Sequence, residues 1–395
     1  MMKCILDNGL EIIALRHAGP ETASITALVN YGTAYEQKSE SAHFLEHMLI
    51  DGSSRSNNAG TYIHGQTFAK STAFHIPYYK KFIKNATHEM FNIIAEPDFK
   101  AKLLNSEKGI IENELLRKLD NQFISFHKQM ELFIFNGKAG RTMTEELKVT
   151  KSMTINKLNK TYCDNYYPIN MRILAYGTIN EKQAINMLKE KFSHFSNTSG
   201  RKNSITFNHP HNITKIINGG QHLSSVGFGV ALLGAEYYSK NIHDFYSFEI
   251  MFNSLIIKLD KMLKEKGLIY ESLCVPAEIL SGAEFCWYCA PVKKRNTEIV
   301  HELIDKEIED LCNEGLSKAE LSIYKKSALM RSIMSRENNF QFSMRLLNFK
   351  MENIFKDKHG ENKYISGITA EDVMASTHKY LSKRNMLIIN AKVEH

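Results

Sequence analysis

The interpretation of this chain starts from one stretch, Ala42-His43-Phe44-Leu45-Glu46-His47-Met48-Leu49. Its apolar residues favour a helix, in which residues three and four positions apart lie on the same face. His43, Glu46 and His47 would therefore point in one direction. Two neutral imidazoles at positions i and i+4 can bind one Zn²⁺, and a carboxylate between them can act on a metal-bound water. The alternative is a surface helix with ordinary His–Glu contacts.

A third ligand is expected further along the chain, because a catalytic zinc site needs three protein ligands and one open position. In the segment 106–116, Glu107 and Glu114 lie seven residues apart, which is nearly two helical turns, so they share one helix face. Glu112 points away from that face. One of the two acids on the shared face can complete the site, and a solvated acidic face is the alternative.

With H-x-x-E-H followed by E-x(6)-E, the chain resembles the pitrilysin/insulysin family of inverzincin metallopeptidases, which includes the mitochondrial processing peptidase. The resemblance implies that His43, His47 and Glu114 bind one Zn²⁺ per chain and that Glu46 is the general base. Glu107 would support the site by orienting one of the ligands. Glu114 follows His47 by only 67 positions, which implies a shortened loop between the two helices.

Members of that family also carry an edge strand, with a G-G-x-x-N-A-x-T pattern, that pairs with the substrate backbone. Here the corresponding stretch is 64–71, where Ala69 and Ser71 match the pattern and Phe68 replaces the Asn. The resemblance implies that Phe68 and Ala69 contact substrate, because adding a peptide as an extra strand needs mainly backbone groups. His64 replaces the first Gly, and a fourth metal ligand at this position is an alternative.

A substrate clamp of the form R-x(6)-Y is a further family feature. Tyr270 is present in the matching stretch, and it would donate a hydrogen bond to the oxyanion. The Arg position holds Leu263, so the neighbouring Lys264 is the substitute candidate for substrate binding. A core tyrosine is the alternative for Tyr270. The missing Arg implies that the chain pairs as a homodimer, or as a heterodimer with a clamp-bearing homologous subunit.

Composition excludes several function classes. The 395 residues are 43% hydrophobic and 24% charged, with a mild net charge of +7 and no basic stripe interleaved with aromatics, which argues against nucleic-acid binding. We find no apolar run of 18 residues and no signal segment, so we expect a cytoplasmic protein without a membrane span. The lone C-x-x-C of Cys286 and Cys289 reads as buried strand rather than as a redox or metal site.

The chain also looks like a diverged duplication. Thr154 and Thr369, and Met171 and Met386, share an offset of 215, and each copy runs from a helix through Asn-Met into an apolar strand. We predict an α+β fold of two similar halves, each a mostly antiparallel sheet covered by helices, which together enclose a cavity. The expected boundaries are a zinc-binding domain at 1–195, a linker at 196–212 and a second domain without metal residues at 213–395.

The predicted function is that of a zinc metalloendopeptidase that cleaves peptides or unfolded segments inside the cavity. Maturation of one dedicated precursor peptide with a partner subunit is a narrower version of the same prediction. The competing prediction is a non-catalytic or assembly subunit that keeps the fold. Retention of every metal residue separates the chain from such subunits.

Overall fold

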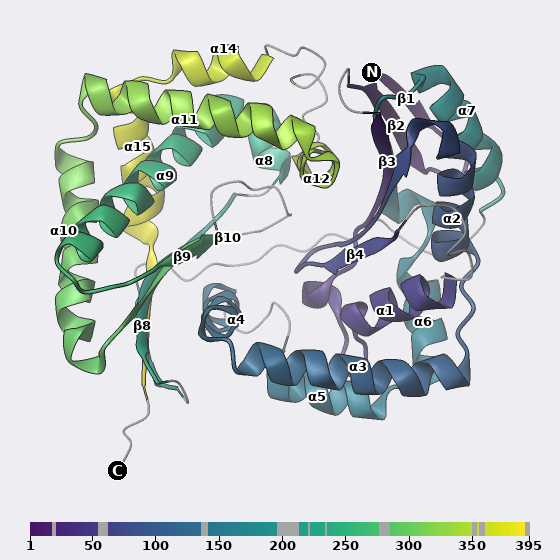
Figure 1. Cartoon of the computed structure of the whole chain (residues 1–395), viewed down its shortest axis with the longest axis horizontal. Helices are drawn as coiled ribbons and strands as arrows, with labels where there is room; N and C mark the ends of the chain where they lie inside the picture. Colours follow the sequence, from purple (N-terminus) through teal and green to yellow (C-terminus); the bar gives the residue numbers. More distant parts are fainter. Residues whose placement is uncertain are drawn as a thin grey trace.

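The structure is a computed structural model that describes residues 1–17, 21–53, 62–135, 141–195, 213–219, 222–233, 235–275, 285–349, 354 and 360–391. The predicted linker at 196–212 lies outside the described residues. The fold is α+β, as predicted, with two sheets that are largely antiparallel and helices packed around them. Figure 1 shows the two halves side by side, the first in purple and blue and the second in green and yellow.

The first half is built on a sheet to which six described strands contribute, in the order β1-β2-β6-β3-β5-β4. Among the described strands β4 is therefore at the edge, where its outer backbone groups face away from the sheet. The strands are β1 (Met2–Ile5), β2 (Glu11–Arg16), β3 (Thr22–Val29), β4 (His64–Thr67), β5 (Thr72–Tyr79) and β6 (Met171–Gly177).

The second half is built on a sheet of five described strands, in the order β7-β11-β8-β10-β9. Each sheet contains one parallel pair, β2 with β6 in the first and β7 with β11 in the second, and the other pairs of described strands are antiparallel. The two sheets thus repeat one topology, with β1 as an addition to the first. The strands are β7 (Ile213–Asn218), β8 (Ser224–Ala231), β9 (Leu273–Val275), β10 (Phe285–Val292) and β11 (Asn385–Asn390).

The helices follow the same repeat. The helix before β6 and the helix before β11 each begin at a threonine N-cap, Thr154 or Thr369. The side chain of each threonine accepts a hydrogen bond from the backbone N–H three residues further along the chain. The helices are α1 (Ala42–Ser53), α2 (Ile83–Ala95), α3 (Ala101–Leu119), α4 (Gln122–Ile134), α5 (Met143–Ser152), α6 (Ile155–Asn165), α7 (Glu181–Phe192), α8 (Ala235–Lys240), α9 (Ile242–Glu265), α10 (Thr297–Asn313), α11 (Lys318–Glu337), α12 (Asn339–Phe349), α14 (Gly360–Gly367) and α15 (Ala370–Tyr380).

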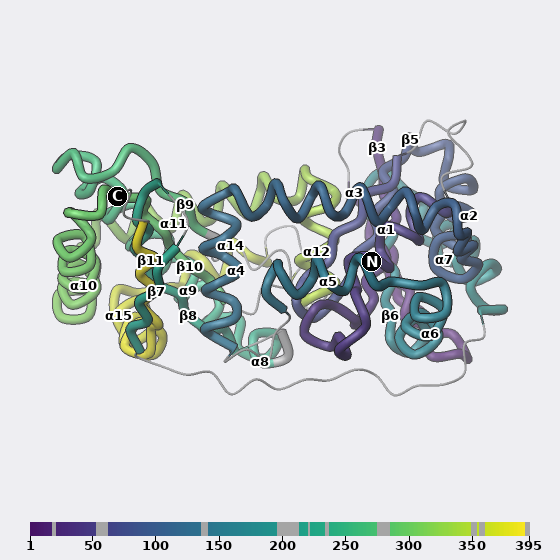
Figure 2. The backbone as a smooth tube through the Cα atoms, turned by 90° about the horizontal axis from the view of Figure 1, so that it is seen from below, coloured from purple at the N-terminus to yellow at the C-terminus, as the bar shows by residue number. Residues whose placement is uncertain are grey.

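Two equivalent helices are exchanged between the halves. Helix α4 comes from the first half of the sequence but packs on β8, β10 and β11 of the second sheet. Helix α12 comes from the second half and packs on β3, β5 and β6, which are the equivalent strands of the first sheet. Both helices follow a long helix, α3 or α11, after a short joint, and Figure 2 shows α3 running from the first half towards α4. The two halves therefore interlock through a reciprocal pair of helices.

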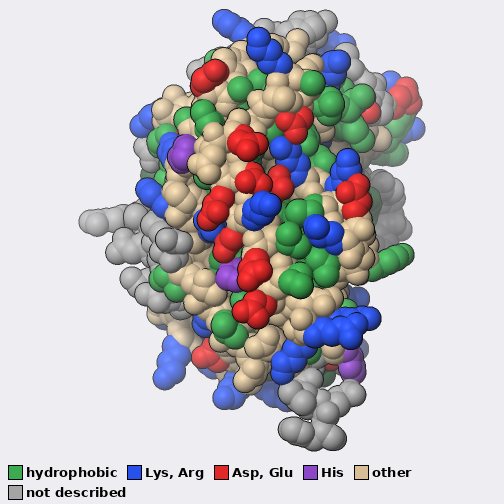
Figure 3. All heavy atoms as spheres, turned by 90° about the vertical axis from the view of Figure 1, so that its left-hand side faces the viewer, with side chains coloured by type: hydrophobic (Ala, Val, Ile, Leu, Met, Phe, Trp, Pro, Cys, Tyr) green, Lys and Arg blue, Asp and Glu red, His purple; other side chains and the backbone are tan. Residues whose placement is uncertain are grey.

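The outer surface of the second half carries a cluster of acids. Figure 3 looks onto the side where α10 lies and shows a column of acidic side chains. The net charge of +7 is therefore unevenly distributed over the surface. The exposed carboxylates of α10 are Glu298, Glu302, Glu309 and Asp310.

None of the described helices is both long and apolar enough to cross a bilayer.

Both thiols of the C-x-x-C pair are buried in β10, as predicted, and they belong to different apolar clusters. Cys286 packs with the cluster around α9, and Cys289 packs with the cluster around α4. Alternation along the strand sends them to opposite faces of the sheet.

Candidate active site

Helix α1 carries the H-x-x-E-H motif, and polar side chains fix its first turn. The Ala42 N–H donates to Glu36 Oε1 (2.7 Å), and the Phe44 N–H donates to Ser41 Oγ (3.1 Å). These bonds satisfy backbone donors that no helical carbonyl can reach. The apolar face of α1, which includes Leu45 and Met48, is completely buried against the first sheet. The opposite face is therefore turned towards α3.

The structure brings His43, His47 and Glu114 together. One ligand atom from each lies within 4.8 Å of the others. The Nε2 atom of His43 is 3.5 Å from Glu114 Oε1, and the Nε2 atom of His47 is 3.4 Å from Glu114 Oε2. The two rings are nearly perpendicular, with centroids 4.7 Å apart. Residues on two separate helices thus point their donor atoms at one small volume.

This donor set fits a zinc ion. Donors about 2.0–2.1 Å from a tetrahedral Zn²⁺ lie about 3.4 Å from one another. The two imidazoles lie at similar distances from the Glu114 carboxylate, His43 from Oε1 and His47 from Oε2. Two imidazole nitrogens and one carboxylate oxygen are the ligands of several catalytic zinc sites. With these three side chains as ligands, a bound Zn²⁺ would keep one position for water or substrate.

The charges of the three side chains are coupled. Hydrogen bonds from His43 and His47 hold the pKa of Glu114 well below its usual range. Burial alone would lower the pKa of His47, but hydrogen bonds to Glu114 and Glu107 outweigh it and raise that pKa to about 9. A bound divalent cation would replace the proton between these groups, because ligands bind metal in their deprotonated forms.

Glu107 lies behind His47 on the same face of α3 as Glu114. The His47 Nδ1 atom is 3.0 Å from Glu107 Oε2, so this bond sets the ring orientation and leaves Nε2 directed at Glu114. Burial, opposed by the His47 hydrogen bond, raises the pKa of Glu107. Glu112 points elsewhere and pairs with Lys151 of α5 (2.9 Å). The two faces of α3 are separated as the sequence predicted.

Asp51 is a residue of the site that the sequence analysis missed. It forms a second potential metal-ligating group with His47 and Glu107, and its hydrogen bond and negative charge both raise the pKa of Glu107. Asp51 lies four residues after His47, so the i, i+4 rule applied to the motif could have found it.

Glu46 is held in place from two sides. Its Oε2 atom accepts a hydrogen bond from Thr67 Oγ1 of β4 (2.5 Å). Its Oε1 atom lies against Gly65, where an added Cβ would be only 2.4 Å from Oε1 and 2.4 Å from Ile50 Cδ1. Gly65 therefore permits a close approach of the edge strand to the carboxylate. Neither Thr67 nor Gly65 was identified from the sequence.

A cavity of about 390 Å³ opens beside His43 and the end of β4. One wall is formed by Gln66, Thr67, Phe68 and Ala69, and another by α4. Phe285 of the second half also lines it, so the cavity lies between the two halves. The predicted substrate-contacting residues Phe68 and Ala69 thus line the same cavity as His43, one of the three candidate metal ligands. Charged side chains complete the lining, namely Glu36, Lys118, Lys128, Glu131, Arg141 and Glu146.

The predicted clamp residues are not brought to this cluster. Tyr270 follows α9 with its side chain 93% exposed, and Lys264 pairs with Asp260 of its own helix (3.1 Å). Leu263, at the family's Arg position, is completely buried in the core of the second half. His64, the alternative fourth ligand, belongs to neither potential metal-ligating group of the described residues and instead packs on Phe340 of α12, with ring centroids 5.0 Å apart.

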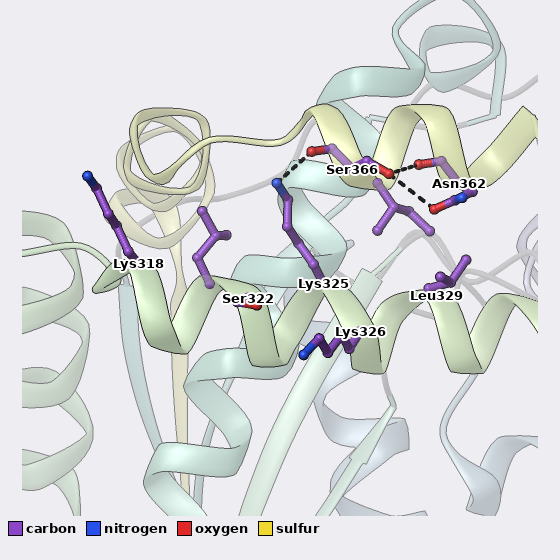
Figure 4. A pocket seen from close by; sticks show the side chains of 9 residues that line it. Lys318, Ser322, Lys325, Lys326, Leu329, Asn362 and Ser366 are labelled. Atoms are coloured by element: carbon purple, nitrogen blue, oxygen red, sulfur yellow. Dashed lines mark hydrogen bonds between the residues drawn. The ribbon is translucent and has the colours of Figure 1, made fainter.

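A second cavity of about 380 Å³ lies between α11 and α14, and none of His43, His47 and Glu114 lines it. Figure 4 shows Lys325 reaching across it, where Nζ donates to the Ser366 carbonyl (2.6 Å). Ser366 in turn bonds to Asn362 within α14. The bond from Lys325 thus joins the two helices, and that from Ser366 stays within α14.

Comparison with known proteins relates the chain to one peptidase family. The family described as "Peptidase M16 inactive domain" matches residues 152–328, a range that begins after the metal residues. The mitochondrial-processing peptidase subunit beta of Dictyostelium discoideum is 27% identical over 203 residues, which cover 48% of this chain and 43% of that protein. The probable zinc protease PqqL of Haemophilus influenzae is 24% identical over 208 residues, which cover 48% of this chain and 22% of that protein. The matches thus span less than half the length of these relatives.

Solved structures share the whole fold. A protease from Helicobacter pylori superposes with a TM-score of 0.82 at 14% identity, covering 98% of this chain and 99% of that one. A peptidase M16 inactive domain from Pseudomonas fluorescens gives 0.83 at 12% identity, covering 100% and 98%. A chain of complex III2 from Candida albicans gives 0.78 at 11% identity, covering 98% and 95%. The domain match, the relatives and the shared fold make this chain similar to the M16 peptidases, in agreement with the family resemblance of its motifs.

Proposed function

We propose that this chain is a zinc-dependent endopeptidase that cleaves peptides or unfolded segments. The observation that carries the proposal is the convergence of His43, His47 and Glu114 on one volume, with the Glu46 carboxylate beside them. His43 and His47 would bind the ion through Nε2, and Glu114 through its carboxylate. A bound Zn²⁺ would supply a water of lowered pKa and a polarised scissile carbonyl.

The chain's own residues would carry the proton transfer. Glu46 takes a proton from the attacking water and returns it to the leaving amine. The hydroxyl of Thr67 fixes Oε2 of that carboxylate through a hydrogen bond. Gly65 has no side chain, so Oε1 can lie close to the backbone of β4. Glu107 holds His47 through Nδ1, which keeps Nε2 aimed at the metal.

The substrate would bind as an extra strand beside β4. This strand is at the edge of the first sheet among the described strands, and it pairs with β5 from His64 to Thr67. A peptide added there would pass over Glu46, which hydrogen-bonds Thr67 of the same strand. Its side chains would then reach the cavity lined by Phe68 and Ala69.

A partner subunit is part of the proposal. Leu263 is buried where the family has its clamp Arg, and both Lys264 and Tyr270 lie outside the lining of the cavity. A relative is itself named as one subunit, the β subunit of the mitochondrial-processing peptidase. We propose a homodimer, or a heterodimer with a clamp-bearing homologue, and dedicated processing of one precursor is the narrower form of this function. Full peptidase activity of a purified monomer would contradict the need for a partner.

A non-catalytic or assembly subunit is the second candidate function. The match to an inactive-type domain and the likeness to a chain of complex III2 favour it. Zinc content and a Glu46→Gln variant distinguish the two candidates. The peptidase proposal predicts that both proteins retain zinc and that only the wild type cleaves an unfolded peptide. Unchanged cleavage in Glu46→Gln would contradict the proposed mechanism, and a zinc-free, inactive wild type would favour the assembly role.

A further inference from the structure

Helix α3, which carries Glu107 and Glu114, packs on α1 and α5 of its own half. Over its length from Ala101 to Leu119 the buried residues are Leu104, Glu107, Ile111 and Leu115. Three apolar side chains of the same helix remain 40–47% exposed, namely Ile110, Leu116 and Leu119. Leu115 is buried, but Leu116 and Leu119 remain exposed where the C-terminal end of α3 leads into α4.

A short, hydrogen-bonded corner joins α3 to α4. Only Asp120 and Asn121 separate the two helices. The Asn121 side chain accepts hydrogen bonds from the backbone N–H groups of Phe123 (3.0 Å) and Ile124 (3.1 Å). This N-cap begins α4, and the Asn121 N–H donates to the Lys118 carbonyl (3.2 Å), which ties the corner to the last turn of α3. The position of α4 is thereby transmitted to the turn of α3 that holds Glu114.

Helix α4 is anchored in the second half. Phe126 and Met130 are completely buried in an apolar cluster with β8, β10 and β11. Gly227 and Gly229 of β8 make room for them, since an added Cβ would lie 2.8 Å from Phe126 Cζ or 2.6 Å from Met130 Sδ. The two side chains therefore sit directly on the backbone of β8.

A hydrogen bond adds direction to this packing. The indole Nε1–H of Trp287 on β10 donates to Nδ1 of His127 on α4 (2.7 Å). Trp287 is the only tryptophan of the chain, and its ring packs on Phe126 with centroids 5.4 Å apart. The contact between the halves is thus both packed and polar.

We infer that the second half positions the third metal ligand, through α4 docked on β8 and β10, so that Phe126, Met130 and Trp287 are positioning residues for Glu114. The inference rests on the proposed zinc site. The second half carries none of the proposed zinc ligands, but through α4 it would still affect zinc affinity. Because coupling between two sites is reciprocal, zinc at Glu114 also favours docking of α4.

Matched phenylalanine truncations on the two faces of the second sheet test the inference. Phe126 packs on the α4 side, and Phe252 of α9 packs on the opposite side against Phe228 of β8; both are completely buried. We expect Phe126→Ala to raise the zinc dissociation constant by roughly tenfold, the effect typical of residues that orient ligands. Phe252→Ala should leave it unchanged. Zinc affinity is measured by competition with a chromophoric chelator.

Emission from Trp287 provides a second measurement on the wild type, should Phe126→Ala fail to fold. Titrating Zn²⁺ into zinc-free protein should change the emission until one equivalent is bound, and Glu114→Ala should abolish the change. Zinc binding without any change in emission, or equal losses of affinity in both phenylalanine variants, would overturn the inference alone. A wild type that binds no zinc would overturn the proposed function and this inference with it.

Discussion

Replacing Gly65 by alanine should impair catalysis without removing the metal. The new Cβ would lie 2.4 Å from Glu46 Oε1, whereas ordinary contact begins at 3.4 Å, so the carboxylate must retreat by about 1 Å. It cannot retreat freely, because Thr67 holds Oε2 at 2.5 Å and Ile50 is equally close to the new methyl group. A misplacement of this size costs about 10²-fold in rate, or about 2.7 kcal/mol in activation free energy.

The assay compares kcat/KM on an unfolded peptide with zinc stoichiometry. Gly65 lacks the left-handed backbone conformation that would strain an alanine, so the variant should fold. Gly109→Ala is the matched control, because a Cβ there meets nothing within 4 Å in the middle of α3. It should keep full activity and gain up to about 1 kcal/mol of stability. Wild-type activity in Gly65→Ala, or loss of zinc from it, would refute this view of Glu46.

Three further predictions concern the hydroxyl that holds Glu46, the carboxylate that orients His47 and the ion pair of Glu11. Thr67→Val removes the hydroxyl that fixes the general base, so kcat should fall roughly tenfold at unchanged zinc content, and an unchanged kcat would contradict it. Glu107→Gln should weaken zinc binding by about 10–100-fold in chelator competition, whereas Glu112→Gln on the opposite face should match the wild type. Glu11 has a pKa lowered to about 2, because Arg172 and Lys3 outweigh burial, which alone would raise it. The ionised Glu11 carboxylate therefore stabilises the fold above the unfolded pKa of 4.5, and this stabilisation is lost as the pH falls towards 2. In urea unfolding of the zinc-free proteins, Glu11→Gln should have a lower free energy of unfolding than the wild type at neutral pH, and the two free energies should converge in acid. A pH-independent difference would contradict that assignment.

Local patterns predicted much of the candidate site. The seven-residue spacing of Glu107 and Glu114 placed both acids on one face of α3, because helical period is a property of the local chain. The offset of 215 predicted the duplication, and Thr154 and Thr369 indeed cap equivalent helices. Short edge strands were harder to predict, and β1 went unpredicted because its four residues are largely exposed and, among the described strands, pair with β2 alone.

Long-range packing could not be predicted in the same way. The apolar stripe of Phe126 and Met130 indicates that one face of α4 is buried, but it does not say against which sheet. The exchange of α4 and α12 between the halves depends on room beside glycines such as Gly227, which is visible only in three dimensions. The bond from Thr67 to Glu46 likewise joins two elements that sequence reasoning treated separately.

The most direct test of the central claim is a zinc-edge anomalous difference map from crystals of the zinc-loaded protein. The account predicts one peak about 2.0–2.2 Å from Nε2 of His43, Nε2 of His47 and an Oε atom of Glu114. A peak at the neighbouring group of His47, Asp51 and Glu107, or no peak near α1 and α3, would contradict it.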